Sequence, residues 1–246
     1  MKKILKWIVF VLLAAMILGG TGFVIWAENP LGPQQVALDA LKSDGSVLVT
    51  EKENYTFFTP VNVKPTTALI FYPGGRVDYR SYAPPLRKIA EQGYMVVLVP
   101  VRLNLAFFDI NAAGPVLQDF PDIQHWAIGG HSLGGVAAAI FAGSHSQIQG
   151  IVYWASYPAD DKLKNSAIKM MSIYATRDGL ATGAKIEASK ALLPTTTFFV
   201  PVVGGDHAQF GAYGPQPGDN PAEITPEEQW QQVAAATAQL LALLEK

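Results

Sequence analysis

Short continuous runs of hydrophobic residues recur along the chain, with helical spacings between them. A run that no polar position interrupts is typical of a parallel strand buried on both faces. Such runs lie at 68–72, 94–99, 126–128 and 150–154, and further strands are predicted at 168–175 and 196–203. The segments with helical spacing lie at 82–92, 112–120, 136–142, 184–192 and from 225 onward. Because strand and helix alternate, the pattern predicts an α/β fold with a mostly parallel sheet flanked by helices.

Both ends of this region carry further signals. Residues 47–51 and 55–59 alternate between apolar and polar positions, with a polar turn between them, which predicts a β-hairpin at the edge of the sheet. Near the C-terminus, Thr225 precedes Pro226 and two glutamates. A capping threonine, a proline in the first helical position and acids in the first turn predict that the last helix begins there.

The N-terminal segment has a different pattern, because no charged residue lies between Trp7 and Ala27. These 21 residues are enough to cross a hydrocarbon layer of ~30 Å, and a tryptophan stands at each end. We expect a transmembrane anchor. The alternatives are a signal peptide cleaved after the weak site Ile25-Trp26-Ala27, and a buried helix of a soluble protein.

These patterns divide the chain into three parts. Residues 1–28 are predicted to be a membrane anchor or signal segment, 29–44 a linker and 45–246 a single α/β domain. Three lysines within the first six residues precede the apolar segment, which predicts an N-terminus inside the cell and a domain outside the cytoplasm. The expected location is the cell membrane, with a single pass; a cleaved signal would instead give a secreted protein.

Composition excludes several classes of protein. Only 15% of the residues are charged and the formal net charge is −2, so we expect no nucleic-acid partner. The chain has no cysteine, which excludes a thiolate nucleophile, a disulfide framework and a cysteine-ligated metal. The histidines and carboxylates show no ligand spacing such as H-E-x-x-H. We therefore expect no metal and no cofactor.

The segment Gly130-His131-Ser132-Leu133-Gly134 carries the strongest chemical signal in the sequence. A G-x-S-x-G motif with a strand before it and a helix after it is a nucleophile elbow, in which a tight turn lifts the serine hydroxyl clear of the sheet. The two glycines leave no Cβ to collide as strand turns into helix. The alternative is a glycine-rich turn with an idle serine.

A serine becomes a nucleophile when a base takes its proton and an acid orients that base. Ser132, Asp178 and His207 each follow the end of a predicted parallel strand, so the three side chains should meet at one edge of the sheet. The pair Asp160 and Asp161, or Asp206 beside the histidine, are alternatives for the acid. His207 is the histidine placed to act as base, and a loop histidine without a catalytic role is its alternative.

These motifs, in the order Ser, Asp, His, resemble those of small single-domain bacterial α/β hydrolases, in the serine esterase and dienelactone-hydrolase-like branch. The resemblance covers residues 45–246. It implies the α/β-hydrolase fold and serine hydrolysis, with Ser132 as nucleophile, His207 as base and Asp178 as acid. Dienelactone hydrolases proper use a cysteine nucleophile, and this chain has none, so that particular substrate is not supported.

An oxyanion hole needs two N–H donors aimed at the alkoxide that forms. The backbone N–H of Leu133, directly after the serine, is expected to be one. The segment Gly74-Gly75-Arg76 follows the run at 68–72 and resembles the glycine-rich oxyanion loop of esterases, with Tyr72-Pro73 in place of the usual preceding histidine. The second donor is expected at Gly75 or Arg76, and a purely structural turn is the alternative.

The sequence therefore predicts a serine hydrolase, carboxylesterase-like, that cleaves small acyl esters through an acyl-serine intermediate on the outer side of the membrane. Its expected partners are a small-molecule acyl ester and the membrane, through the N-terminal segment. An acyltransferase or amidase with the same three residues is an alternative. A membrane-tethered binding protein that keeps the fold without catalysis is another.

Overall fold

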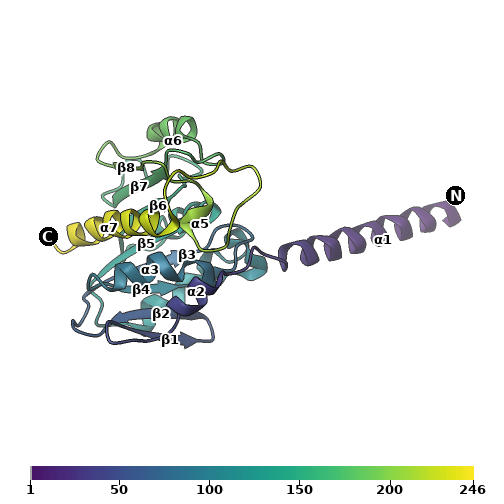
Figure 1. Cartoon of the computed structure of the whole chain (residues 1–246). Coiled ribbons are helices and arrows are strands. Elements are labelled where there is room, and N and C mark those ends of the chain that lie inside the picture. The colour runs from purple at the N-terminus through teal and green to yellow at the C-terminus, as the bar shows by residue number, and fades with distance from the viewer. Residues whose placement is uncertain (1) are drawn as a thin grey trace.

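The computed structural model describes residues 2–246. Its strands are β1 Val47–Lys52, β2 Tyr55–Pro60, β3 Thr67–Tyr72, β4 Met95–Leu98, β5 His125–His131, β6 Ile148–Trp154, β7 Lys169–Ala175 and β8 Phe198–Val202. Its α-helices are α1 Lys2–Ala27, α2 Gln35–Ala40, α3 Ala83–Ala90, α4 Gly114–Asp119, α5 Leu133–Ala142, α6 Gly183–Ser189 and α7 Pro226–Leu244. Short 3₁₀ turns connect several of these elements (Figure 1).

The strands form one eight-stranded sheet in the order β1-β2-β4-β3-β5-β6-β7-β8. β1 and β2 form the predicted hairpin at one edge, and β2 is also antiparallel to β4. All pairings from β4 to β8 are parallel. The predicted fold class, a mostly parallel sheet flanked by helices, is confirmed.

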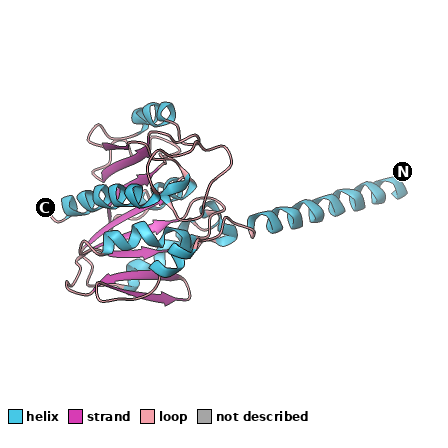
Figure 2. Cartoon of the chain, in the orientation of Figure 1, coloured by secondary structure: helices cyan, strands magenta, loops and turns pink. Residues whose placement is uncertain are grey.

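Helices cover both faces of the sheet (Figure 2). Leu69 and Phe71 of β3 pack in the core on the side of α3 and α7, whereas Ala68, Ile70 and Tyr72 pack in the core on the side of α4 and α5. Successive side chains of a strand point to opposite faces, so a strand that is apolar throughout can build both cores. This explains why β3 is buried at every position.

The carboxyl ends of the parallel strands lie on the side from which α1 leaves the domain. α7 is antiparallel to the strands of the parallel part of the sheet. Glu245, just beyond the end of α7, accepts a hydrogen bond from Thr67 Oγ1 at the start of β3 (2.8 Å). The end of α7 therefore marks the amino ends of the strands. α1 projects on the opposite side of the domain (Figure 1).

Some predicted elements differ from those observed. The strand predicted at 126–128 runs on as β5 to His131, directly before Ser132. The helix predicted at 112–120 is divided into a 3₁₀ turn, Ile110–Ala113, and the short α4. Pro115 stands in the first turn of α4. The N–H that proline lacks would have no partner in a first turn, so α4 can begin just before Pro115. The last helix begins at Pro226 with a complete capping box on Thr225, as predicted.

The N-terminal segment forms one long helix. α1 is exposed along most of its length, whereas Ala27 at its end is fully buried. Within residues 2–246, α1 is the one helix long and apolar enough to cross a membrane. The predicted linker, 29–44, contains α2 and lies on the domain: Leu31 pairs with Val77, and Gln34 donates its backbone N–H to the Ala212 carbonyl (2.7 Å).

Candidate active site

Ser132 lies in a strained turn between β5 and α5. Its backbone angles, φ 52° and ψ −121°, are ones that a residue with a side chain rarely adopts. The turn is tight, because a Cβ on Gly130 would lie 2.4 Å from the Gly134 carbonyl carbon, and one on Gly134 would lie 2.3 Å from the Pro73 oxygen. The two glycines of the motif are therefore required by the packing of the turn, as the sequence predicts.

Hydrogen bonds from β6 and the loop after it hold the turn in place. Ser132 donates its N–H to the Trp154 carbonyl (3.0 Å), and its own carbonyl accepts a hydrogen bond from Ser156 Oγ (2.6 Å). These two hydrogen bonds hold the strained backbone of Ser132 in place. Ser156 is a positioning residue that the sequence reasoning missed. Trp154 itself belongs to the core, where its Nε1–H donates to Thr237 Oγ1 (3.1 Å).

Asp178 and His207 form a buried pair. Nδ1 of His207 lies 2.8 Å from Oδ2 of Asp178, and both side chains are almost completely shielded from solvent. The other carboxylate oxygen accepts the backbone N–H groups of Leu180 (2.7 Å) and Ala181 (2.6 Å). Because both oxygens of Asp178 accept, the histidine carries its proton on Nδ1 and leaves Nε2 as the basic nitrogen.

Nε2 of His207 is buried and has no hydrogen-bond partner within residues 2–246. The side chain of Ser132 makes no capping hydrogen bond to α5. Ser132 and His207 line the same pocket. In enzymes without substrate, the bond between nucleophile and base is often long and tightens only in the complex, so this arrangement suits a serine and its base.

The other candidate acids lie elsewhere. Asp160 and Asp161 are exposed, and Asp160 pairs with Lys162. Asp206 is buried, but its carboxylate accepts the N–H of Gln209 (2.8 Å). Burial is the main cause that raises the pKa of Asp206. Of the alternatives that the sequence leaves open, Asp178 is the acid in contact with His207.

A second acid, Asp219, ties the loops of this pair together. One oxygen accepts the N–H of Gly179 (2.9 Å), next to Asp178, and the other accepts the N–H of Ala208 (2.8 Å), next to His207. The sequence reasoning missed Asp219, because it lies in a polar loop far from any predicted strand. Through these two hydrogen bonds, Asp219 holds the loop of Asp178 next to the loop of His207.

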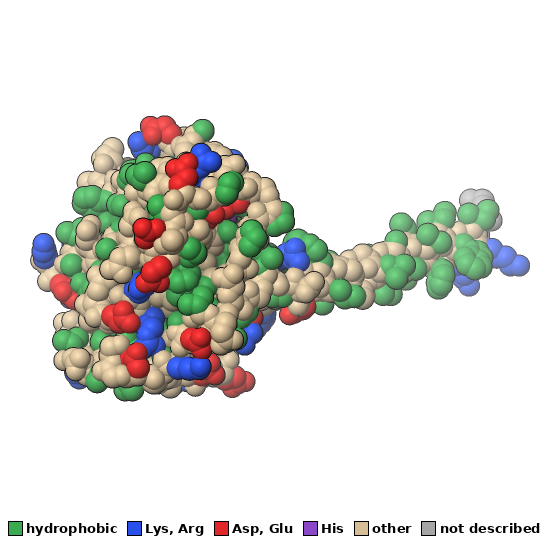
Figure 3. All heavy atoms as spheres, viewed as in Figure 1, with side chains coloured by type: hydrophobic (Ala, Val, Ile, Leu, Met, Phe, Trp, Pro, Cys, Tyr) green, Lys and Arg blue, Asp and Glu red, His purple; other side chains and the backbone are tan. Residues whose placement is uncertain are grey.

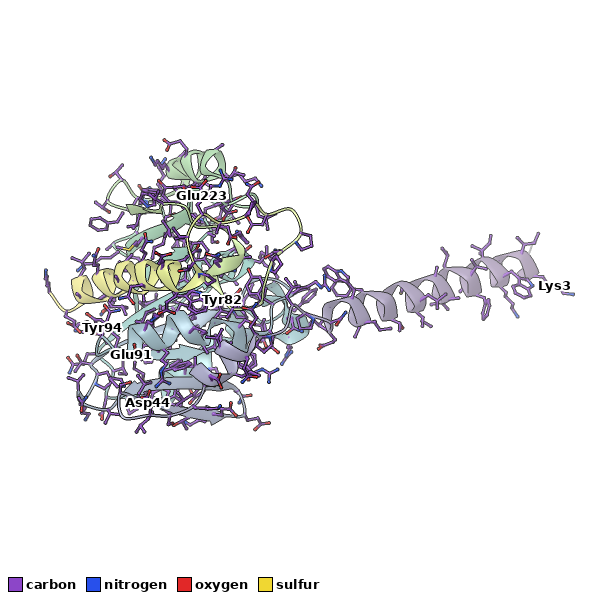
Figure 4. All side chains as sticks on the ribbon, viewed as in Figure 1. Lys3, Asp44, Tyr82, Glu91, Tyr94 and Glu223 are labelled. Atoms are coloured by element: carbon purple, nitrogen blue, oxygen red, sulfur yellow. The ribbon has the colours of Figure 1, made fainter. Side chains whose placement is uncertain are left out.

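His131 lies beside the candidate catalytic residues and is bonded to the core residue Tyr82. Its Nδ1 accepts the hydroxyl of the fully buried Tyr82 (2.8 Å), and that hydroxyl accepts the N–H of Gly74 (3.0 Å). The ring of His131 lies 4.4 Å from that of His207, measured between centroids. Tyr82 and His131 thus connect the elbow to the loop after β3. Tyr82 lies within the domain in Figure 4.

The two candidate oxyanion donors, Leu133 and Gly75, are neighbours in space. A Cβ on Gly75 would lie 2.6 Å from the Leu133 side chain. Neither backbone N–H has a hydrogen-bond partner within residues 2–246. The N–H of Arg76, in contrast, donates to the Asn104 carbonyl (2.7 Å). Of the two residues that the sequence offers for the second donor, Gly75 is therefore the one with a free N–H.

A mostly apolar pocket of about 340 Å³ opens beside the serine. Its lining residues are Phe107, Ser132, Leu133, Val136, Ala155, Ser156, Tyr157, Pro158, Ala159, Leu180, Ala181 and His207. Mostly apolar walls beside a serine suit an acyl chain. Within residues 2–246, no group of three or more His, Asp or Glu side chains is placed to hold a metal ion.

Comparison with known proteins identifies the family of the chain. A model of the alpha/beta hydrolase family matches residues 68–231, which include Ser132, Asp178 and His207. The chain belongs to the alpha/beta hydrolase family. This confirms the resemblance expected from the sequence. No curated protein sequence matches the chain.

Several solved structures share the fold of this chain. An esterase domain from Rhodothermus marinus superposes with a TM-score of 0.60 at 14% identity, over 79% of this chain and 97% of that one. Est1E from Butyrivibrio proteoclasticus gives 0.56 at 10% identity, over 80% and 100%. A dienelactone hydrolase from Anabaena variabilis gives 0.57 at 16%, over 80% and 96%. At these identities the likeness concerns the fold.

We expect the buried His131 to make the stability of this alpha/beta hydrolase depend on pH. Burial lowers its pKa well below the usual value, and the neighbouring His207 adds to the effect. Below about pH 6.5 the unfolded chain protonates this histidine and the folded chain does not. Acid therefore favours unfolding, and the free energy of unfolding should fall by up to about 1.4 kcal/mol per pH unit from this side chain.

The comparison of wild type with His131→Asn measures this contribution. Asparagine can still accept the Tyr82 hydroxyl but does not titrate. Thermal unfolding of both full chains in detergent, followed by circular dichroism between about pH 7.5 and 5, should show a steeper fall of Tm for the wild type. Parallel curves would mean that His131 is protonated as easily in the folded protein as in the unfolded chain.

Proposed function

We propose that this alpha/beta hydrolase is a serine esterase, with Ser132 as nucleophile, His207 as base and Asp178 as the orienting acid. The observation that carries the proposal is the pocket that Ser132 and His207 share, with the buried Asp178 holding the far side of the imidazole. The strained backbone of Ser132 presents its hydroxyl to this pocket. The esterases among the solved structures with this fold agree with the proposed reaction.

The reaction would proceed in two halves. His207 Nε2 takes the proton of Ser132 Oγ as the oxygen bonds to the ester carbonyl carbon. The carbonyl oxygen becomes an alkoxide, and the N–H groups of Leu133 and Gly75 donate to it. The alkoxide then re-forms the carbonyl as the alcohol leaves, with the proton from His207. A water activated by the same nitrogen releases the acid from Ser132.

The N-terminal helix supports a location at the cell membrane, with the hydrolase domain outside the cytoplasm. Lys3 lies at the far end of α1 from the domain (Figure 4). Positive residues remain on the cytoplasmic side of a membrane helix, so this end would be inside. The substrate would then be an acyl ester outside the cell.

Labelling with a fluorophosphonate tests the nucleophile. The probe forms a bond to an activated serine, so the full-length wild type in detergent should be labelled and Ser132→Ala should not. The two proteins should also differ on short p-nitrophenyl esters, where the wild type releases p-nitrophenol. No labelling of the wild type, or equal labelling of both proteins, would exclude a serine hydrolase that uses Ser132.

A further inference from the structure

The end of α1 is fastened to the loop that carries the candidate oxyanion donor. Arg76 donates from Nε to the Trp26 carbonyl (2.9 Å) and from Nη2 to the Asn29 carbonyl (2.7 Å). Its guanidinium lies over the Trp26 ring at 4.2 Å from the ring centroid. The last carbonyls of a helix have no partner within it, so Arg76 caps α1 from another part of the chain.

A second loop of the domain holds the same helix end. Asn104 donates its side-chain N–H to the carbonyl of the buried Ala27 (3.1 Å). Deeper along α1, the ring of Phe23 packs against that of Phe108, with 5.9 Å between centroids. The Asn104 carbonyl also accepts the N–H of Arg76. The two loops and the end of α1 therefore form one connected unit.

This unit borders the pocket of the candidate active site. Phe107 lines the pocket with Ser132 and His207, and it stands next to Phe108 in the same turn. Phe107 and Phe108 are 45% and 54% exposed, which is unusual for two adjacent phenylalanines. Gly75, next to Arg76, lies against Leu133 at the elbow. The pocket is thus built beside the point where α1 enters the domain.

The depth of α1 in a membrane sets the depth of these residues. Trp7 and Trp26 stand near its ends, at a separation of about 30 Å along the helix, so Trp26 would lie at the outer interface. Phe23 lies about 4.5 Å deeper along the axis. Phe108, which contacts Phe23, would therefore lie at the level of the lipid headgroups. No charged residue lies on α1 from Trp7 to Ala27, and Figure 3 shows apolar side chains along this helix, most densely on the part away from the domain.

We propose that the mouth of the active site rests on the outer surface of the membrane, with Phe107 and Phe108 in contact with lipid, and that the substrate is an amphiphilic ester held in that leaflet. The acyl group enters the pocket from the interface while the remainder of the molecule stays among the lipids. This inference rests on the proposed esterase function. It also requires that α1 is retained, because cleavage after Ala27 would remove the Trp26 and Ala27 carbonyls from Arg76 and Asn104.

The position of the mouth can be measured without any reaction. The chain has no cysteine, so Phe108→Cys and Ser146→Cys each give a single site for a bimane label. Ser146 is exposed and lies just before the start of β6, at the amino ends of the parallel strands and therefore on the side of the sheet away from α1. With the full chain in phosphatidylcholine vesicles, spin-labelled lipid should quench the label at 108 and leave the label at 146 bright. Equal quenching at both positions would overturn the proposal.

The substrate class is tested with two esters that share one acyl group. Methylumbelliferyl butyrate dissolves in water, whereas the butyrate of heptadecylumbelliferone stays in the vesicle. Phe108→Asp should lower the rate on the vesicle-held ester by about tenfold, because it removes a large apolar contact with lipid. The rate on the soluble ester should not change, since Phe108 does not line the pocket. Phe108→Leu, which remains apolar, should behave as the wild type.

The outcomes separate this inference from the function on which it rests. Equal rates of wild type and Phe108→Asp on the vesicle-held ester, with the soluble ester still cleaved, would overturn the membrane inference alone. A wild type that cleaves neither ester would overturn the esterase proposal. An equal loss on both esters for Phe108→Asp would show damage to the pocket, and would overturn the assignment of Phe108 to lipid contact.

Discussion

Replacement of His207 by alanine should lower kcat on p-nitrophenyl butyrate by about 10⁶, since the nucleophile and its base act as a unit and the loss of either removes the whole attack. Nε2 of His207 is the one basic nitrogen in the pocket, because His207 alone among the described histidines lines it. Residual turnover over water would come from the N–H groups of Leu133 and Gly75 and from substrate binding. Steady-state kinetics of the full chain in detergent measure the effect.

His131→Asn is the matched control for His207→Ala. Both histidines are buried and their rings are neighbours, but His131 is bonded to Tyr82 and does not line the pocket. The control should retain far more activity than His207→Ala, and both variants should keep the circular dichroism of the wild type. If His131→Asn lost as much activity, the role of base would not belong to His207.

The sheet could be predicted from the sequence because its central strands are buried on both faces. β3, β4 and β6 are apolar at nearly every position, so each strand stands out without any knowledge of its neighbours. The order of the strands could not be predicted in this way. β4 lies between β2 and β3 in the sheet although it follows both in the sequence. The hydrophobic pattern along the chain does not predict this order.

The reacting residues could be predicted because each has a local signal. Ser132 lies in a glycine-flanked turn, and Asp178 and His207 each follow a recognisable strand. The residues that position them have no such signal. Tyr82 is bonded to His131, 49 positions along the chain, and Asp219 accepts N–H groups from Gly179 and Ala208, 40 and 11 positions away. Only the folded chain brings these partners together.

Arg76 lies beside the candidate site, as the sequence predicts, but its contacts differ from those of an oxyanion donor. The sequence places it beside the site as a possible oxyanion donor, but its N–H is bonded to Asn104 and its guanidinium caps α1. The backbone of Arg76 is left-handed, with φ 56°, and its side chain reaches the end of α1. The sequence could not reveal this contact, because Arg76 bonds to backbone carbonyls, which every residue carries.

Asp178→Asn should lower kcat by about 10⁴ while leaving the fold intact. The carboxylate accepts the proton on Nδ1 of His207 and so keeps Nε2 free to take the proton from Ser132. An asparagine can present its NH₂ group to Nδ1 instead, which moves the ring proton to Nε2 and leaves no base facing the serine. KM should change little, since Asp178 does not line the pocket.

Asp206→Asn separates this effect from the loss of any buried carboxylate nearby. Asp206 stands next to His207 in the chain, but its carboxylate accepts a backbone N–H from Gln209, which an asparagine oxygen can also accept. This variant should therefore keep most of its turnover. Asp160→Asn, at an exposed position, should leave kcat unchanged. A larger loss of kcat in either control than in Asp178→Asn would transfer the role of acid to that residue, because only the acid that orients the imidazole can control which of its nitrogens is basic.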